Sequence, residues 1–404
     1  MSNFAFGTYR ISDYNPQHIE ALKEAIGSGI TMIDTSSNYM DGGAERAVAL
    51  AFREFDEDVK HRVEIVSKFG YIQGVSLKRH QDEAFDEVVE FSKDCFHSIS
   101  KSFLQDQLTE SLKRLEMQRL DCYLIHNPEY YLLDAINKQV DKDDRLDEMY
   151  RRLYRAFVGL EEEVKNGRIS SYGISSNSFS KDNNSDEFLP YEDLITIADR
   201  ASEEAGNETH SFTTIQLPIN ILEREGLKCA SWAKENGLRV LVNRPLNAEY
   251  ENQMYRLADY DEPREYFHHL NELLEVCDNE TLQPLYNLFE ELDASKHKFG
   301  WIGDYDSFFY AQIIPHIRTS LDVIDEKNRE TMLNFIDLFF IEYRQMVLFE
   351  CSKNTRSKLN EFFQNCDTTM QECSLRFLMD RESIDYVLVG MRKPSYVHEV
   401  LAVS

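Results

Sequence analysis

Eight short apolar runs alternate with amphipathic segments along most of this 404-residue chain, and this alternation constrains the fold more than any other feature. Several runs are nearly continuous in Val, Ile, Leu, Met or Tyr, which is typical of parallel strands buried on both faces. Such strands are expected at Phe4–Arg10, Ile30–Asp34, Val63–Ser67, Asp121–Ile125, Ser170–Ile174, Thr213–Leu217, Arg239–Asn243 and Asp385–Val389. Eight strands, each followed by a helix, close an α/β barrel of the (β/α)8 or TIM type. An open doubly wound sheet is the alternative, and it is disfavoured because no Gly-x-Gly-x-x-Gly follows any strand.

The segments between the strands carry apolar residues at helical spacing. Several of them end in a glycine, which can cap a helix in the left-handed conformation. Helices are therefore expected at Gln17–Gly29, Ala44–Phe55, Ser102–Met117, Tyr154–Gly167, Tyr191–Ala205, Gly226–Asn236, Met370–Arg381 and Ser395–Val403.

Three stretches exceed what a minimal barrel needs. Phe69–Lys101 contains one polar helix pattern around Asp82–Phe91. Asn127–Arg152 contains the charged run Asp141–Asp147, which we interpret as a solvated face. The largest stretch, residues 247–369, is rich in Leu, Phe, Tyr and Glu at helical spacing and is too long for a loop without structure. We expect it to be a helical subdomain of about four helices, inserted in a single barrel of residues 1–404.

The insertion leaves the predicted barrel after the seventh strand. Barrel enzymes hold their active sites on this C-terminal face. A lid over the active site and a contact for self-association are therefore both open interpretations of the insertion.

Composition narrows the class of protein. Hydrophobic residues make up 42% of the chain, enough for a large buried core, and the net charge of −28 disfavours nucleic acid or an anionic membrane as a partner. No apolar run reaches the ~18 residues that a membrane span requires, and the first residues show no signal-peptide pattern. The seven cysteines lack Cys-x-x-Cys spacing, which indicates reduced thiols. We expect a cytoplasmic protein without a disulfide framework or a zinc site.

Four polar residues stand where predicted strands end. Asp34 closes the second strand, and Tyr39 follows it in a loop. Lys68 ends the third strand, and His126 ends the fourth. Each residue alone has an ordinary structural explanation, such as a helix cap, packing or a solvated cation. Because barrel enzymes take their chemistry from the C-terminal ends of different strands, we expect the four to converge above the barrel mouth.

These side chains form a coherent acid–base set. A tyrosine hydroxyl has a pKa of about 10, and a nearby ammonium lowers this pKa by stabilising the phenolate. We therefore expect Lys68 to lower the pKa of Tyr39, with Asp34 holding Lys68 in place. A neutral His126 can donate a hydrogen bond to an oxygen that gains charge. Such a set suits a carbonyl group whose carbon receives a hydride and whose oxygen receives a proton.

Several motifs follow one another from near residue 5 to the last residue, outside the insertions. They are Gly7-Thr-Tyr-Arg-Ile, Met32-Ile-Asp-Thr-Ser-Ser-Asn-Tyr39, Ile65-Val-Ser-Lys-Phe-Gly70, Ser111-Leu-Lys-Arg-Leu-Glu-Met-Gln-Arg-Leu-Asp-Cys-Tyr-Leu-Ile-His126, Asn166-Gly-Arg-Ile-Ser-Ser-Tyr-Gly-Ile-Ser-Ser-Asn177, Gln216 and Val389-Gly-Met-Arg-Lys-Pro394. In this order they resemble the aldo-keto reductase superfamily, of which this chain would be a divergent member with a large helical insertion.

The resemblance implies an enzyme that binds NADPH, with NADH as the alternative. Its reaction would be the reduction of a small aldehyde or ketone, or the oxidation of the alcohol in reverse. Tyr39 would be the general acid/base, and Lys68 would tune its acidity. Asp34 would anchor Lys68, and His126 would orient the carbonyl group.

The resemblance also implies a set of cofactor-binding residues. Ser175 and Gln216 match side chains that grip the nicotinamide carboxamide. Gly390, Met391 and Arg392 match the turn and helix start near the adenosine phosphate, where the basic Arg392 favours the 2′-phosphate of NADPH. The remaining candidates are Asn243, Arg244, Leu246 and Glu399.

Departures from the family pattern leave a second function open. The family usually stacks an aromatic side chain on the nicotinamide after the seventh strand, where this chain has Asn243, with Arg244 beside it as a contact for the pyrophosphate. A nicotinamide-nucleotide-binding regulatory or interaction protein with little turnover is therefore the alternative. A barrel enzyme that uses Asp34 and His126 without nicotinamide is a third reading. No metal is expected, because the pair His268-His269 has no third ligand near it in the sequence.

Overall fold

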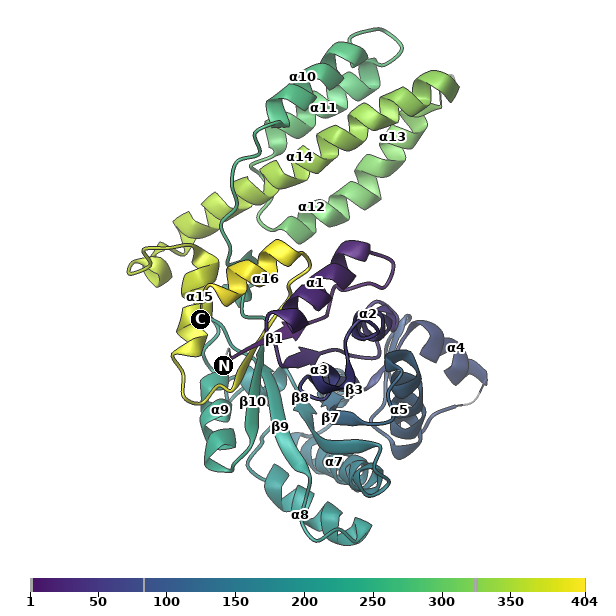
Figure 1. Ribbon diagram of the computed structural model, residues 1–404, viewed down its shortest axis with the longest axis vertical. Coiled ribbons are helices and arrows are strands. Elements are labelled where there is room, and N and C mark those ends of the chain that lie inside the picture. Colours follow the sequence, from purple (N-terminus) through teal and green to yellow (C-terminus); the bar gives the residue numbers. More distant parts are fainter. Residues whose placement is uncertain (1–2, 83, 323, 325, 404) are drawn as a thin grey trace. The chain divides into compact units, whose positions relative to one another are not determined.

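The computed structural model describes residues 3–82, 84–322, 324 and 326–403. The chain forms two compact units, which are described separately below (Figure 1). The first unit comprises residues 1–245 and 375–404, and the second comprises Leu246–Ser374. The boundary at Ser374 falls inside helix α15 (Met370–Met379).

The first unit is a closed barrel of eight parallel strands. They are β1 (Phe4–Gly7), β2 (Met32–Asp34), β3 (Glu64–Phe69), β7 (Leu120–His126), β8 (Ile169–Ser175), β9 (Phe212–Pro218), β10 (Arg239–Asn243) and β13 (Tyr386–Val389). Their order around the barrel is β1-β13-β10-β9-β8-β7-β3-β2. Side chains from several of these strands, among them Ala5, Val66 and Leu241, are fully buried in one cluster. The (β/α)8 barrel predicted from the apolar runs is confirmed, and each predicted run overlaps one strand.

Helices connect the strands of the barrel. They are α1 (Pro16–Gly27), α2 (Gly43–Phe52), α3 (Glu57–Lys60), α5 (Lys101–Leu115), α6 (Tyr130–Asn137), α7 (Lys142–Lys165), α8 (Leu194–Ala205), α9 (Gly226–Glu235), α16 (Pro394–Leu401) and the 3-10 turn η1 (Ser178–Ser180). Local chemistry sets their ends. The side chain of Asn15 accepts a hydrogen bond from Gln17 N, and Pro16 occupies the first turn of α1, where a missing N–H costs nothing. Ser100 caps α5 by accepting from Phe103 N.

The segment after β3 differs from its prediction. A helix was expected around Asp82–Phe91, but the helix α4 covers Gly74–Asp82 instead. The strand β4 (Tyr71–Ile72) before this helix and the strands β5 (Val89–Ser92) and β6 (Cys95–His97) after it form an antiparallel sheet in the order β4-β6-β5. We call this three-stranded sheet the added sheet. Residues 89–92 form a strand and not the predicted helix because apolar and polar residues alternate in Val89-Glu-Phe-Ser92, which is the period of a strand.

The charged run Asp141–Asp147 is the beginning of a helix. The side chain of Asp141 accepts from Asp143 N and caps α7, which starts at Lys142 and is longer than the predicted Tyr154–Gly167. Asp143 and Asp144 lie in the first turn, where negative side chains interact favourably with the helix dipole. The acidic run is thus a helix start, and its residues 141–144 and 147 are exposed, in agreement with the interpretation as a solvated face.

The second unit begins with a hairpin and continues as helices. Its elements are β11 (Asn247–Tyr250), β12 (Gln253–Arg256), α10 (Tyr266–Cys277), α11 (Gln283–Ser295), α12 (Ile302–Phe308), the π-helix η2 (Phe309–Ile313), α13 (Ile314–Leu321), α14 (Glu326–Lys358) and the 3-10 turn η3 (Asn360–Phe363). The sequence did not predict the hairpin. Because η2 joins α12 to α13 without a break, the described residues of this unit form four long helical segments, the number expected. Tyr266, Phe289, Phe339 and Tyr343 are fully buried in a core of this unit's own.

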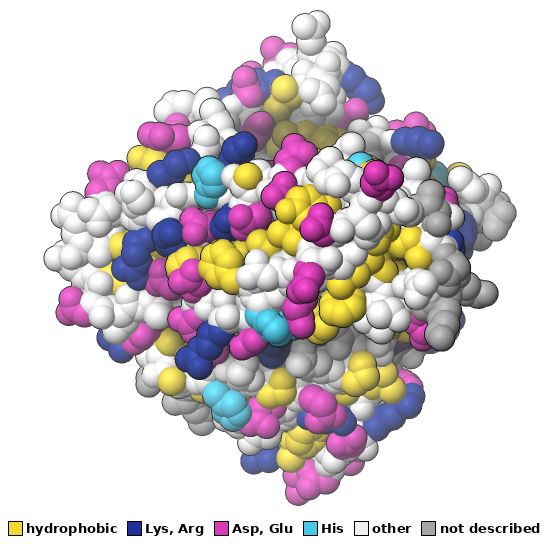
Figure 2. Space-filling model, turned by 90° about the horizontal axis from the view of Figure 1, so that it is seen from above, with side chains coloured by type: hydrophobic (Ala, Val, Ile, Leu, Met, Phe, Trp, Pro, Cys, Tyr) yellow, Lys and Arg dark blue, Asp and Glu magenta, His cyan; other side chains and the backbone are white. Residues whose placement is uncertain are grey.

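Hydrophobic side chains also reach the surface of the molecule between charged ones, as Figure 2 shows for one face. Large exposed examples in the second unit are Phe267, Tyr310, Leu338 and Ile341. Among the described helices, none combines the length and the hydropathy that a membrane span needs.

The expectation of reduced thiols throughout was wrong at one place. Cys366 and Cys373 form a disulfide in the segment that precedes and begins α15. Their spacing matches no common motif, and only the turn between them brings their Cα atoms within 6.0 Å. The other five cysteines are free.

Candidate active site

A buried ion pair lies at the C-terminal ends of β2 and β3. Lys68 Nζ is 2.7 Å from Asp34 Oδ1 and donates to the carbonyl oxygen of Thr35 at 2.8 Å. The Lys68 side chain is fully buried, and Asp34 is almost so. Burying an ammonium is costly unless a counter-charge and acceptors surround it, so the site holds Lys68 in one position.

Tyr39 reaches this pair from the loop after β2. The loop is pinned to β3, because Thr35 N donates to Val66 O and Ser37 N donates to Lys68 O. Lys68 Nζ lies 3.4 Å from the Tyr39 hydroxyl and 5.0 Å from the centre of its ring. The half-buried phenol therefore has the ammonium directly beside its oxygen.

His126 completes the set from the end of β7. Its ring lies edge-on to the Tyr39 ring, with 5.9 Å between the ring centres. Its Nδ1 lies 3.2 Å, and Asn38 Oδ1 2.7 Å, from the oxygen of the Ser36 hydroxyl, which has one proton to donate. The structure thus brings all four predicted catalytic residues together at one end of the barrel.

Two further candidates extend the same network. Gln216 Nε2 donates to Asp34 Oδ1 at 2.7 Å, and Ser175 Oγ donates to Gln216 Oε1 at 2.8 Å. Ser175 and Gln216 face each other in the register of β8 and β9, and His126 is the partner of Ser175 in β7. The parallel register of these strands therefore places the residues side by side.

Burial sets the protonation of this cluster. It raises the pKa of Tyr39 well above its usual value, and the charge of Asp34 adds to this effect. Burial lowers the pKa of Lys68, although Asp34 opposes the shift. Burial, assisted by the charge of Lys68, lowers the pKa of His126 well below its usual value. At neutral pH the phenol is therefore protonated and the imidazole neutral.

The direction of the Tyr39 shift differs from the expectation. We expected Lys68 to lower the pKa of Tyr39, but desolvation of the phenol raises it, and the nearby carboxylate of Asp34 adds to the shift. The raised pKa keeps Tyr39 protonated at neutral pH, and it makes the phenol a weaker acid than free tyrosine.

The candidates after β10 carry polar atoms without partners. Among the described residues, the buried Asn243 Oδ1 and Arg244 Nε have no hydrogen-bond partner. Arg244 has a positive φ of 53°, and its Nη2 donates to Glu223 Oε1 at 2.7 Å. Leu246 is buried and is the first residue of the second unit, where its carbonyl accepts from Leu257 N.

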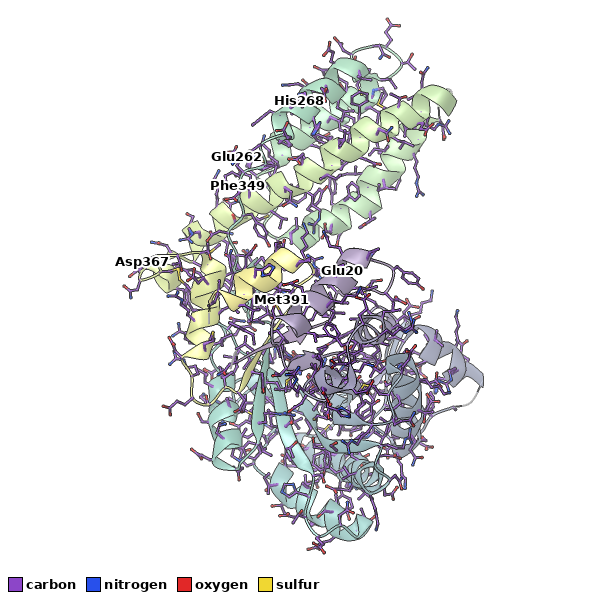
Figure 3. The ribbon with its side chains drawn as sticks, viewed as in Figure 1. Glu20, Glu262, His268, Phe349, Asp367 and Met391 are labelled. Atoms are coloured by element: carbon purple, nitrogen blue, oxygen red, sulfur yellow. A yellow bond between two sulfur atoms is a disulfide. The ribbon has the colours of Figure 1, made fainter. Side chains whose placement is uncertain are left out.

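The candidates near the C-terminus follow β13. Gly390 and the buried Met391, which Figure 3 labels, lie between β13 and α16. Arg392 is exposed, and its charge lowers the pKa of His18 in addition to the larger effect of burial. Glu399 is exposed on α16.

Sequence reasoning missed three neighbours of the catalytic set. Ser36 contacts the His126 ring, as described above. The ring of Tyr71 lies 4.9 Å from the His126 ring, and His97 Nε2 lies 2.8 Å from the carbonyl oxygen of His126. Tyr71 and His97 belong to the added sheet, which the sequence analysis did not predict, so no pattern in the sequence linked them to His126.

The histidine pair of the insertion has a near neighbour that we did not find. His268 Nε2 and His269 Nδ1 lie 3.5 and 3.4 Å from Glu272 Oε2. The three residues share one surface of α10, where Figure 3 labels His268.

The fold and the cluster together define a class of protein, an α/β barrel with an acid–base site at the C-terminal ends of its strands. The model of the Aldo/keto reductase family matches residues 3–404, and the chain belongs to this family. The resemblance found in the motifs is confirmed.

Individual relatives are distant. The chain is 24% identical to the aldo-keto reductase YhdN of Bacillus subtilis over 225 residues, which are 55% of this chain and 50% of the relative. The chain thus spans about half the length of this curated relative. An aldo/keto reductase of Klebsiella pneumoniae, solved with NADP and acetate, is 16% identical with a TM-score of 0.48, covering 100% of this chain and 86% of that one. The holo form of the aldo-keto reductase AKR11C1 from Bacillus halodurans is 19% identical with a TM-score of 0.41, and the match covers 69% of this chain and 74% of that one.

Proposed function

We propose that the protein is an NADPH-dependent oxidoreductase that reduces an aldehyde or ketone by direct hydride transfer. The observation that carries this proposal is the unbroken line of contacts from Gln216 through Asp34 and Lys68 to Tyr39, with the neutral His126 beside the phenol. The relatives support it, since an aldo/keto reductase was solved with NADPH. We place the protein in the cytoplasm, with a small carbonyl compound or alcohol as its substrate.

The residues at the mouth fit a nicotinamide dinucleotide. The buried Asn243 Oδ1 lacks a donor and Arg244 Nε lacks an acceptor among the described residues. A carboxamide N–H and a phosphate oxygen would satisfy them. Ser175 and Gln216 would hold the nicotinamide end. For the adenosine phosphate we propose Gly390, Met391 and Arg392, with Arg392 favouring NADPH over NADH. Glu399 and, in the second unit, Leu246 stay predicted cofactor contacts.

When bound, NADPH supplies the hydride that the carbonyl carbon receives. The Tyr39 hydroxyl donates its proton to the carbonyl oxygen, so the product is an alcohol and the electron pairs balance. Lys68 stabilises the phenolate that remains, and Asp34 keeps Lys68 charged and in place. His126 donates a hydrogen bond to the same oxygen and orients it, because its low pKa leaves the ring neutral.

Replacement of Tyr39 by Phe tests the assignment. The variant removes only the acidic proton, so we expect kcat to fall at least 100-fold while the affinity for NADPH, measured by its fluorescence, is unchanged. Tyr14→Phe is the matched control, because Tyr14 is 84% exposed. The assay is NADPH oxidation against a panel of aldehydes, ketones and sugars. Retained turnover in Tyr39→Phe would contradict the role of this residue.

The same panel separates the two functions considered. Tight NADPH binding by the wild-type protein without oxidation of NADPH against any compound would indicate a nucleotide-binding regulatory protein. If the protein leaves the fluorescence of NADPH unchanged, it does not bind this nucleotide, and both the reductase and the nucleotide-binding function would be contradicted.

A further inference from the structure

The added sheet meets the barrel at the backbone of the catalytic histidine. His97, at the end of β6, donates from Nε2 to the carbonyl oxygen of His126 at 2.8 Å. Both residues are buried. Burial lowers the pKa of His97 to about 4, with the charge of Arg152 adding to the shift, so the ring is neutral. A neutral ring with its hydrogen on Nε2 suits this contact.

Gly70 makes room for this hydrogen bond. It lies between β3 and β4, with a positive φ of 151°. A Cβ atom at this position would lie 2.5 Å from the His126 carbonyl oxygen and 2.6 Å from His97 Nε2. Both distances are shorter than real contacts, so a side chain here would displace one partner of the hydrogen bond.

A second pair of contacts holds the residue after His126. Asn127 Nδ2 donates to the Tyr71 hydroxyl at 2.6 Å, and Asn127 N donates to Ser175 O at 2.7 Å. The Tyr71 ring lies edge-on to the His126 ring. The dipeptide His126-Asn127 is therefore fixed by the added sheet on one side and by β8 on the other.

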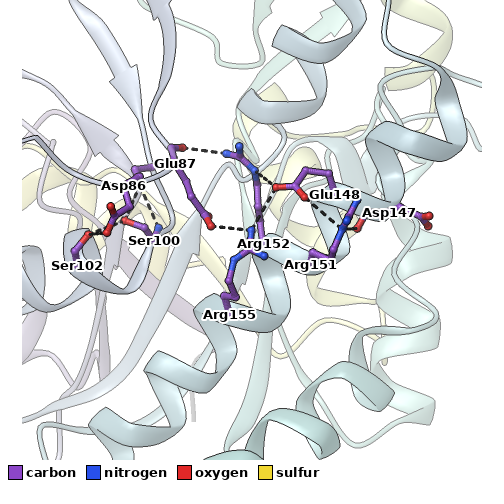
Figure 4. Close-up of polar contacts among 10 residues, drawn as sticks. Asp86, Glu87, Ser100, Ser102, Asp147, Glu148, Arg151, Arg152 and Arg155 are labelled. Atoms are coloured by element: carbon purple, nitrogen blue, oxygen red, sulfur yellow. Dashed lines mark hydrogen bonds and ion pairs between the residues drawn. The ribbon is translucent and has the colours of Figure 1, made fainter.

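The added sheet is itself tied to the helices of the barrel (Figure 4). Arg152 on α7 donates to the carbonyl oxygen of Glu87, and Arg155 pairs with the Glu87 carboxylate at 2.7 Å. Ser102 on α5 donates to Asp86 Oδ2 at 2.9 Å. These contacts precede β5 directly, so the sheet cannot move away from His126 without breaking them.

We propose that His97 is a positioning residue for the reaction, which holds the backbone of His126 so that its imidazole faces Tyr39 and the substrate oxygen. This inference rests on the proposed function, and it assigns the added sheet a part in the active site. His97 does not touch the reacting atoms. It acts through His126, and a displacement of a catalytic group by about 1 Å is enough to cost a large part of the rate.

Two substitutions distinguish positioning from packing. His97→Leu keeps a similar volume without a donor, and His97→Gln keeps an N–H donor. We expect His97→Leu to lower kcat 10- to 100-fold with unchanged NADPH affinity, and His97→Gln to restore most of the loss. His80→Leu is the matched control, because His80 lies in the same segment and stacks on Phe85. A kcat of His97→Leu equal to that of the wild type would overturn the proposal.

A spectroscopic measurement separates this inference from the proposed function. The ring 15N signals of His126, identified by their loss in His126→Gln, report its tautomer and environment without turnover. We expect them to shift or broaden in His97→Leu and to stay in place in His80→Leu, even if the wild-type protein oxidises no NADPH. Unchanged His126 signals in His97→Leu would contradict the positioning role. If His97→Leu fails to fold, Tyr71→Phe replaces it, because this variant removes the hydroxyl that accepts from Asn127 Nδ2. Its kcat and its His126 15N signals are then measured, and wild-type values of both would contradict the proposal.

Discussion

At the scale of single residues, burial affects the protonation states of the site residues more than the neighbouring charges do. Lys68 is fully buried beside Asp34, and removing the carboxylate would leave an uncompensated cation in the barrel mouth. The same desolvation raises the pKa of Tyr39 and lowers the pKa of His126. The two groups therefore stay uncharged over a wide range of pH, the phenol as a donor of a proton and the imidazole as a donor of a hydrogen bond.

The depressed pKa of His97 predicts a loss of stability in acid. Above pH 6.5 the ring is neutral in both states. Below pH 6.5 the ring takes up a proton in the unfolded chain, whereas in the folded protein it stays neutral down to about pH 4. The folded state is therefore destabilised as the pH falls from 6.5 to about 4. From pH 7 to pH 5 we expect this group to cost about 2 kcal/mol of the free energy of unfolding. His126, whose pKa is also lowered, acts in the same direction.

Urea unfolding at the two pH values measures this contribution. In His97→Gln the difference between pH 7 and pH 5 should shrink by about 2 kcal/mol, because His126 remains and only His97 is lost. The charged and titratable neighbours of His97, namely Tyr71, Tyr130, His126 and Arg152, are unchanged in this variant. An equal difference in the variant and the wild type would mean that His97 is not desolvated as described.

At the scale of elements, the junction between β3 and β4 is the most constrained point near the site. We expect Gly70→Ala to lower the free energy of unfolding by about 2–3 kcal/mol, because the positive φ and the close contacts with His126 and His97 both oppose a side chain. We also expect kcat to fall, since the side chain forces the two partners apart.

Gly237→Ala is the control for Gly70→Ala. Gly237 also has a positive φ, but a Cβ there would meet no atom within 4 Å. This variant should lose only about 1 kcal/mol of stability and keep its activity. Similar kcat values for the two variants would show that backbone strain alone explains the effect at Gly70.

At the scale of the whole molecule, the chain is two units with separate cores. Phe339 is buried among Tyr266, Phe289 and Tyr343 in the second unit. Phe157 packs against rings of the barrel. Because each core belongs to one unit, we expect calorimetry to resolve two unfolding transitions, of which NADPH shifts only that of the barrel.

Two core variants assign these transitions. Phe339→Ala should lower only the transition of the second unit, and Phe157→Ala only that of the barrel, each by about 3–5 kcal/mol. A single transition that both variants lower alike would show that the units unfold together. The interpretations of the second unit as a lid or as a contact for self-association both remain predictions, and analytical ultracentrifugation tests the second.

The sequence by itself determined the barrel, and it predicted the four polar residues that the structure brings together at the strand ends. Apolar runs of five to seven residues indicate strands directly, since a strand buried on both faces is mostly apolar. In barrels of this type the C-terminal ends of the strands mark where the active site lies. The tertiary structure alone decided what surrounds the site. His97 and Tyr71 reach His126 through an antiparallel sheet whose pairing joins residues far apart in the chain, and Cys366 meets Cys373 only through a turn. The sign of the Tyr39 shift also depended on three-dimensional burial, because desolvation is a property of the packed site and not of neighbours in sequence.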